Sequence, residues 1–244
     1  MTTVLKLGGS VITHKGERES IDEDALDRAA AAVAAAPEDL VVVHGGGSFG
    51  HPVADAHGIS PSEGTQDAAA ALDVHDTMAL LSDAVVARIQ NHGGAALPVH
   101  PLSAAVRDET GDLALGTAPV EAMLAEGFLP VLHGDVVVQT GVGVTIVSGD
   151  ELVVALAEAL SADRVGLCSA VPGVLDGRGD VVPRIDDFQA VADALGGSDA
   201  TDVTGGMAAK VRALLALDAP ASVFGLDHLE AFLEGGSPGT LVCG

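Results

Sequence analysis

The chain lacks tryptophan and tyrosine and has only five phenylalanines, so alanine, valine and leucine must supply most of its core. Lysine is almost as scarce: the 11 basic residues include only three lysines, against 35 acidic residues, and the net charge is −24. A field this negative repels nucleic acid and anionic lipid, which excludes both as partners. Because 48% of the residues are hydrophobic, the acidity does not indicate disorder.

Cysteine and long apolar runs are scarce as well. Cys168 and Cys243 show no Cys-x-x-Cys spacing, so we expect neither a disulfide framework nor a zinc site, and the two cysteines fit a reducing cytosol. No apolar run approaches the ~20 residues of a membrane span. No basic segment precedes an apolar run at the N-terminus, so no signal peptide is predicted. We therefore expect a cytoplasmic protein.

An acidic, lysine-poor and alanine-rich chain is typical of a protein adapted to high cytoplasmic salt. Concentrated salt screens charges over a few ångströms, which relieves the self-repulsion of the acidic surface. We therefore predict a halophilic protein that loses stability in dilute buffer.

Short β-branched runs alternate with alanine-rich helical patterns along the chain. Candidate strands are Thr3–Leu7, Leu40–His44, Ala95–His100, Pro130–Val138, Val144–Val147, Arg164–Cys168, Ser222–Phe224 and Thr240–Cys243. Candidate helices are Asp22–Ala36, Thr65–Asn91, Pro119–Glu126, Asp150–Ser161, Phe188–Leu195, Gly206–Leu217 and Leu226–Glu234. This alternation, with continuously apolar strands, predicts an α/β protein whose mainly parallel sheet is covered on both faces.

The length suits one large domain, residues 1–244, with two lobes that share the sheet. The glycine-rich segment Thr140–Thr145 falls between two groups of elements. We interpret it as the passage from an N-terminal lobe, about 1–140, to a C-terminal lobe, about 141–244.

Glycine-rich turns follow several of the expected strands, where ligands bind in sheets of this kind. In VVVHGGGSFGH (Val41–His51), three glycines let backbone amides approach a bound anion closely. A tight turn without a ligand is the alternative. Gly45, Gly47 and Gly50 also satisfy the dinucleotide fingerprint, but Pro52 interrupts the helix start that it requires, and a helical pattern replaces its second strand.

All three lysines lie beside such turns. Lys6 and Lys15 flank Gly8 and Gly9, and Lys210 follows Gly205-Gly206. Phosphoryl transfer needs cations around the γ-phosphate and its bridging oxygen, and a lysine ammonium acts there as a compact point charge. Three leftover solvated lysines are the alternative interpretation. The sequence holds no GxxxxGK[ST], so it is not a P-loop enzyme.

Three further side chains are candidates for the site. His51 closes the triple-glycine segment, where an imidazole can bind phosphate in either charge state. Asp150 begins a helix and either caps it or holds two lysines in register. Met78 lies on the apolar face of Thr65–Asn91, where core packing is the usual role and a place in a substrate pocket is the alternative. Asp135 and Asp202 resemble Asp150 with weaker claims, His44 and His133 are weaker candidates too, and His57, His75, His92 and His100 carry no motif.

Taken together, KLGGS, HGGGSFGH, PVLHGD, SGDEL and DVTGGM-x-x-K resemble the amino acid kinase superfamily over essentially the whole chain. Within it, GGGSFGH and the early His14-Lys15 are similar to the archaeal isopentenyl phosphate kinases. The resemblance implies a three-layer αβα sandwich and a homodimer. It also implies transfer of the γ-phosphate of ATP, with Mg²⁺, to isopentenyl phosphate, which yields isopentenyl diphosphate in an alternative mevalonate route to isoprenoids.

The resemblance also implies roles for individual residues. The residues expected in catalysis are Lys6, Lys15, Lys210, Asp150 and His51. Those expected to bind ATP are Lys6, Gly8, Gly9, Ser10, Lys15, Asp150, Gly173, Asp176, Gly205, Gly206 and Lys210. Those expected to bind the acceptor are Gly45, Gly46, Gly47, Gly50, His51, Met78 and Gly134. No protein ligand for Mg²⁺ is expected, since phosphates and water usually hold this ion.

One motif departs from the family pattern, because Ser169-Ala170 stand where family members often have Thr-Asp before the nucleotide loop. Two other functions remain open at this point. One is a sister kinase that acts on a phosphonate, a carboxylate or a nucleoside monophosphate. The other is a non-catalytic nucleotide-binding or storage protein. The presence of all three lysines argues against it, because a protein that only binds nucleotide would tolerate their loss.

Overall fold

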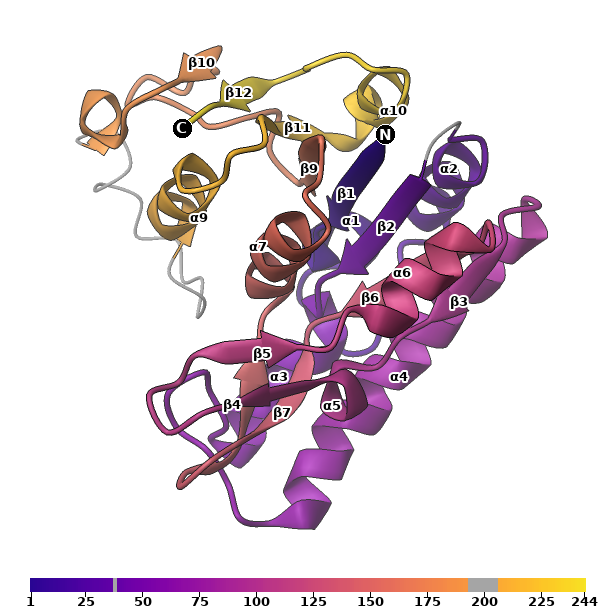
Figure 1. The fold of residues 1–244 in the computed structure, drawn as a ribbon, viewed down its shortest axis with the longest axis vertical. Helices are drawn as coiled ribbons and strands as arrows, with labels where there is room; N and C mark the ends of the chain where they lie inside the picture. Colours follow the sequence, from indigo (N-terminus) through magenta and orange to yellow (C-terminus); the bar gives the residue numbers. More distant parts are fainter. Residues whose placement is uncertain (37–38, 193–205) are drawn as a thin grey trace.

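The computed structural model describes residues 1–36, 39–192 and 206–244 and shows two sheets with helices packed around them (Figure 1). In spatial order, the large sheet contains β10 (Arg184–Ile185), β12 (Thr240–Val242), β11 (Ala221–Gly225), β9 (Arg164–Ser169), β1 (Thr2–Leu7), β2 (Asp39–His44), β6 (Leu129–His133) and β3 (Ala96–Pro98). Among these described strands the pairings are parallel, except that β11 and β12 are antiparallel. The predicted, mainly parallel α/β sheet is therefore confirmed.

Alternate side chains of the central strand β1 enter two separate cores. Val4 packs with the layer of α6 (Ala118–Ala125), α7 (Gly149–Ala159) and α9 (Gly206–Leu215). Leu5 and Leu7 pack with the layer of α2 (Glu23–Ala34), α4 (Ala68–Asn91) and α10 (Leu229–Leu233). A strand buried on both faces must be apolar throughout, as VLKL is apart from Lys6. The two helical layers enclose the sheet and complete the three-layer sandwich (Figure 1).

The second sheet has four strands in the order β5 (Leu113–Leu115), β4 (Ala105–Arg107), β7 (Asp135–Gln139) and β8 (Gly143–Val147). It packs against α4 and the short α5 (Pro101–Ala104), and together with α3 (Gly47–His57) it encloses a third, smaller core. The segment Thr140–Thr145, which we interpreted as a passage between lobes, forms the turn of the β7–β8 hairpin and the first residues of β8. The remaining short elements are α1 (Gly9–Ile12) and the 3₁₀ helices Phe188–Ala190 and Leu226–His228.

The structure corrects several predicted elements. The expected strand Pro130–Val138 is two strands in different sheets, because the chain changes sheet at Gly134. Helix α4 begins at Ala68, where Asp67 caps the amides of Ala69 and Ala70. Phe188–Leu195 is described only to residue 192, and its first residues form a 3₁₀ helix. No helix in the described ranges has the length and apolar character to cross a membrane.

The sequence-based expectation for Pro52, which follows the triple-glycine segment, was wrong. Pro52 lies inside helix α3, where we expected it to prevent a helix. A proline at this position lacks the N–H that would donate to the carbonyl four residues earlier, that of Ser48. The Glu19 N–H donates to that carbonyl instead, with an N···O distance of 3.0 Å. The helix therefore continues through Pro52 without an unsatisfied acceptor at Ser48.

Candidate active site

A cavity of about 640 Å³ opens at the carboxyl ends of β1, β2 and β9, where ligands bind in parallel sheets. Its walls come from the turn after β1, the starts of α3 and α7, the first turns of α9, and the middle of α4. The volume lies within the range of small-molecule binding sites. Glycines supply much of the lining, so backbone atoms are close to any bound molecule.

The two glycine turns pack against each other through their backbones. A Cβ on Gly9 would lie 2.1 Å from the Gly47 nitrogen, and a Cβ on Gly45 would lie 2.7 Å from the Gly9 nitrogen. Gly47 also has φ +50, a left-handed conformation that favours glycine. The turn after β1 and the turn after β2 therefore form one rigid backbone surface, and side chains at these three positions would separate them.

Hydroxyl groups fasten this surface to the segment that carries Lys15. Thr13 Oγ1 donates to the Gly9 carbonyl at 2.8 Å and accepts the Ser48 N–H at 3.0 Å. Ser48 Oγ in turn donates to the Ser20 carbonyl at 3.2 Å. These bonds hold residues 13–20, with Lys15, across the start of α3.

Asp150 stands between two of the lysines at the start of α7. Its Oδ1 is 2.7 Å from Lys6 Nζ, and its Oδ2 is 3.9 Å from Lys210 Nζ. All three side chains are only 13–21% exposed, so solvent screens the ion pairs weakly. One carboxylate therefore fixes two ammonium groups that come from β1 and α9. Asp150 does not cap the helix, because Ser148 Oγ accepts the Glu151 N–H and serves as the N-cap.

The cavity is electrically distinct from the rest of this acidic chain. The charged side chains that line it in the described part of the chain are Lys6, Lys15, Arg18 and Lys210 against Glu17, Asp55, Asp135 and Asp150. Four positive charges balance four negative ones, whereas the whole chain carries −24. All three lysines of the chain line this one cavity. An anionic ligand therefore meets here a field that the outer surface does not offer.

Met78 lies where α4 approaches the start of α3. Its sulfur would be 2.5 Å from a Cβ on Gly50 and 3.2 Å from one on Gly46, so these glycines leave room for the thioether. Met78 is 2% exposed and lines the cavity together with Val74 and Ile59. The far end of the cavity is therefore apolar, while the lysine end is charged.

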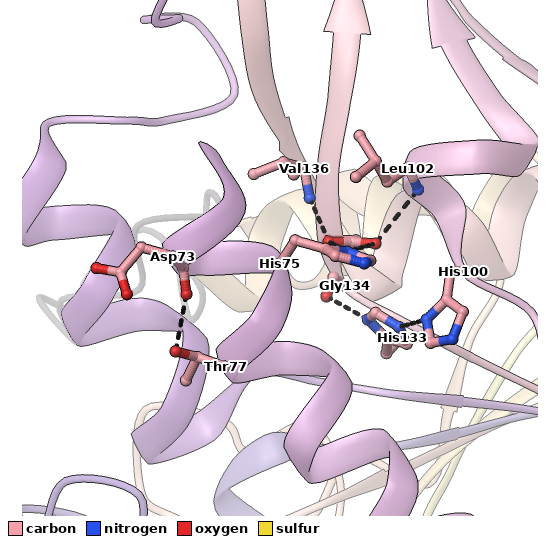
Figure 2. A network of polar contacts seen from close by, with 9 residues as sticks. Asp73, His75, Thr77, His100, Leu102, His133, Gly134 and Val136 are labelled. Carbon is pink, nitrogen blue, oxygen red and sulfur yellow. Dashed lines mark hydrogen bonds and ion pairs between the residues drawn. The ribbon is translucent and has the colours of Figure 1, made fainter. Parts of the chain in front are cut away.

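Three histidines, His75, His100 and His133, lie next to one another beside the buried Asp135, which lines the cavity. A fourth, His44, stacks on His133. The His75 Nδ1–H donates to both Asp135 oxygens at 3.0 Å, and the Leu102 and Val136 N–H groups donate to the same carboxylate (Figure 2). Beside this group, His100 Nδ1 lies 3.0 Å from His133 Nε2, and His133 Nδ1 contacts the Gly134 carbonyl at 2.9 Å. The sequence predicted no role for His75 and His100. The structure shows that both belong to this network and help to position Gly134 and Asp135.

Two of these imidazoles are buried as neutral bases. Burial lowers the pKa of His44 to about 4, against a weak opposing effect of the hydrogen bond to the Gly45 carbonyl. Burial also lowers the pKa of His133 to about 4; interaction with His44 acts in the same direction, since the two rings resist being protonated together, and Asp135 opposes the shift. The two rings stack with centroids 5.4 Å apart. Neither imidazole lines the cavity, so the structure assigns them no contact with a ligand.

Most of the predicted site residues meet at this cavity. Those that line it are Lys6, Gly8, Gly9, Ser10, Lys15, Gly45, Gly46, Gly47, Gly50, His51, Met78, Gly134, Asp150 and Lys210. Gly206 begins α9 but does not line the cavity, whereas Met207 and Lys210 of the same helix do. Gly205 and Asp202 lie outside the described residues.

Gly173 and Asp176 lie away from the cavity lining, so their contact with a nucleotide stays a prediction. Asp176 Oδ1 accepts the N–H groups of Arg178 and Asp180, and these bonds lower its pKa. The carboxylate thus holds a tight turn closed. Asp108 accepts the Thr110 and Asp112 N–H groups in the same way in the β4–β5 turn.

Sequence reasoning missed Thr13, Arg18 and Ser48 as cavity residues, and it gave Asp135 only a weaker claim than Asp150. Thr13 and Arg18 lie within three residues of Lys15, so proximity to that lysine was an available signal. Asp135 follows Gly134 in the PVLHGD motif, but its burial beneath α4 depends on the sheet change, which the sequence did not reveal.

A model of the amino acid kinase family matches residues 1–217. The chain belongs to the amino acid kinase family and is a phosphotransferase. It is 61% identical to the isopentenyl phosphate kinase of Haloferax volcanii, over 99% of this chain and 98% of that protein. It is 33% identical to the isopentenyl phosphate kinase of Methanocaldococcus jannaschii, over 86% and 85% of the two chains. A solved structure of isopentenyl phosphate kinase superposes on this chain with a TM-score of 0.84 at 26% identity, and the superposition covers 100% of both chains.

Proposed function

We propose that this kinase transfers the γ-phosphoryl group of ATP to isopentenyl phosphate and releases isopentenyl diphosphate and ADP. The observation that carries the proposal is the meeting of all three lysines at one glycine-lined cavity in a chain of net charge −24. The likeness to isopentenyl phosphate kinases over nearly the full length of this chain supports the choice of acceptor.

The reaction joins two anions, so its main barrier is electrostatic. An acceptor phosphate oxygen attacks the γ-phosphorus of ATP while the bond from that phosphorus to the β,γ-bridging oxygen breaks. The attacking oxygen is already ionised, so no general base removes a proton. Catalysis then depends on positioning and charge stabilisation, which preorganised cations and amides provide.

Lys6 and Lys210 stabilise charge on the transferred phosphoryl group and the leaving β-phosphate. Asp150 holds both ammonium groups in place through its two oxygens, so they need little rearrangement when ATP binds. Lys15 approaches from the segment fastened by Thr13 and Ser48. The turns at Gly8-Gly9 and Gly46-Gly47 bring backbone amides close to both phosphate groups.

His51 and the start of α3 bind the acceptor phosphate. His51 lies one turn into α3 and lines the cavity beside Gly47 and Gly50. An imidazole donor suits an acceptor with several phosphate oxygens better than one with a single carboxylate. The apolar end of the cavity, around Met78 and Val74, takes the five-carbon chain of the substrate.

Mg²⁺ accompanies ATP in this proposal and neutralises part of its charge. Within the described ranges, no group of three or more His, Cys, Asp or Glu side chains is arranged to hold a metal ion. Phosphate oxygens and water are the ligands that Mg²⁺ usually keeps in such sites, so the ion arrives with the nucleotide.

Several expectations complete the proposal. The N-terminal lobe binds the acceptor and the C-terminal lobe binds the nucleotide, since His51 and Met78 belong to the first and Lys210 to the second. The acidic composition suits a cytoplasm of high salt concentration, and the working form is a homodimer.

A panel of acceptors tests the proposed function. The enzyme is assayed with ATP and isopentenyl phosphate, dimethylallyl phosphate, a phosphonate, acetylglutamate or UMP in molar salt, and ADP release is measured. We expect the greatest kcat/KM with isopentenyl phosphate. Turnover only with acetylglutamate or UMP would replace this function with that of a sister kinase, and nucleotide binding without any turnover would indicate a binding protein.

A further inference from the structure

A buried arginine joins the small sheet to the helix start that carries Asp150. Arg107 ends β4, and its side chain is only 6% exposed. Its guanidinium donates to the carbonyls of Gly111 at 3.0 Å and Ile146 at 3.1 Å, and to Glu151 Oε1 at 2.6 Å. Arg107 therefore connects the β4–β5 hairpin, strand β8 and the first turn of α7.

Glu151 is part of the cap of α7. Its Oε2 accepts the Ser148 N–H at 2.9 Å, while Ser148 Oγ accepts the Glu151 N–H at 3.2 Å. The two oxygens of Glu151 thus have different partners: Oε1 meets Arg107, and Oε2 closes the capping box. The orientation of this carboxylate determines how the first turn of α7 is held.

The same turn presents Asp150 to Lys6 and Lys210. Without Arg107, only the Ser148 N–H and the start of α7 would face the negative charge of Glu151, one residue from Asp150. The field at the cavity, and so at the lysine pair, would then become more negative.

Stability alone does not account for an arginine at this position. Arg107 Nε is buried without a hydrogen-bond partner among the described residues, so the pairing leaves one donor unsatisfied. Arg107 is buried but Glu151 is 38% exposed, and such a pair contributes little net stability because desolvation of the guanidinium offsets its attraction to the carboxylate. The pairing does, however, fix the orientation and the charge of Glu151 beside the lysine pair.

We propose that Arg107 is a positioning residue for phosphoryl transfer: it neutralises Glu151 and so keeps Lys6 and Lys210 available to the phosphates. This inference rests on the proposed function, because it concerns the same site. It adds a residue outside the cavity lining that acts through the cap of α7.

The test is a double-mutant cycle with Arg107→Gln, Glu151→Gln and both together. Two quantities are measured in molar salt and again at the lowest salt concentration in which the protein stays folded. They are kcat for isopentenyl phosphate, and the Kd of a non-hydrolysable ATP analogue from calorimetry. Arg107→Lys serves as the conservative variant. Arg28→Gln is the control, because Arg28 pairs with Asp227 on the surface, where the two side chains are 59% and 82% exposed.

We expect Arg107→Gln to lower kcat about tenfold and to weaken binding of the analogue, more strongly at low salt, because the charge of Glu151, no longer paired with Arg107, acts on nearby cations. Glu151→Gln should have a small effect, since glutamine also completes a capping box. The double variant should recover most of both losses, Arg107→Lys should recover part of them, and Arg28→Gln should match the wild type.

Two outcomes would overturn the inference. One is Arg107→Gln with a lower melting temperature but unchanged kcat and Kd, which indicates a purely structural role. The other is a double variant whose losses equal the sum of the single ones. A wild type that binds the analogue but does not phosphorylate isopentenyl phosphate would overturn the proposed function instead, and the Kd cycle would still decide the role of Arg107.

Discussion

The buried pair His44 and His133 should make the protein sensitive to mild acid. In the unfolded chain each imidazole takes up a proton near its ordinary pKa of 6.5, whereas in the folded protein the pKa is about 4. Between these values the unfolded state binds more protons. The free energy of unfolding therefore decreases as pH falls through 6.5, and this loss levels off below about pH 4.

The size of the effect follows from linkage. At pH 5, a shift from 6.5 to about 4 corresponds to about 2 kcal/mol for each histidine, or about 4 kcal/mol for the pair. A typical domain is stable by only about 5–15 kcal/mol. The lowered pKa values of exposed carboxylates such as Asp27 and Asp176 act only below their ordinary value of 3.8, so the window from pH 7 to pH 5 isolates the histidines.

Urea unfolding in molar salt at pH 7 and pH 5 measures this loss directly, since salt screens the general charge of the surface. His44→Gln removes one titrating group and one hydrogen bond, of 3.3 Å to the Gly45 carbonyl. We expect this variant to lose about half as much stability between the two pH values as the wild type. Equal stability of the wild type at both pH values would refute the reasoning, and so would an unchanged loss in His44→Gln.

The remaining predictions concern catalysis and salt. Lys6→Ala and Lys210→Ala should each lower kcat by roughly 10²-fold or more, as loss of a charge-stabilising group does, and near-normal kcat would remove these lysines from the mechanism. His51→Ala should raise KM for the acceptor and lower kcat, and unchanged acceptor kinetics would contradict its assigned role. Met78→Ala should extend the accepted alkyl chain, because it enlarges the apolar end of the cavity, and an identical substrate profile would count against that. Finally, the melting temperature should fall when molar salt is replaced by dilute buffer, and a constant value would argue against adaptation to salt.

The parts of the fold that depend on local patterns were predictable from the sequence. The apolar strands around β1 and the long helix α4 follow from periodicity, and they are confirmed almost to their ends. The two short strands of the β4–β5 hairpin were not predicted, because three-residue strands carry too little pattern. In the helix through Pro52, the Ser48 carbonyl is satisfied by the Glu19 N–H, which only the folded chain brings near.

The candidate site was predictable because its chemistry is concentrated in scarce residues. An acidic chain with three lysines makes each lysine informative, and all three line the cavity. The supporting network was not predictable. Arg107, His75 and Asp135 meet their partners across large separations in sequence, and two of them belong to a second sheet that the sequence did not reveal.

The main-chain contact between Gly9 and Gly47 has a consequence for how the reacting groups are spaced. The turn after β1 and the turn after β2 touch through main-chain atoms, so their separation is independent of side-chain rotamers and of dissolved ions. A chain can therefore carry many acidic residues on its surface, as this one does with its net charge of −24, while the spacing of the two turns at the cavity stays constant.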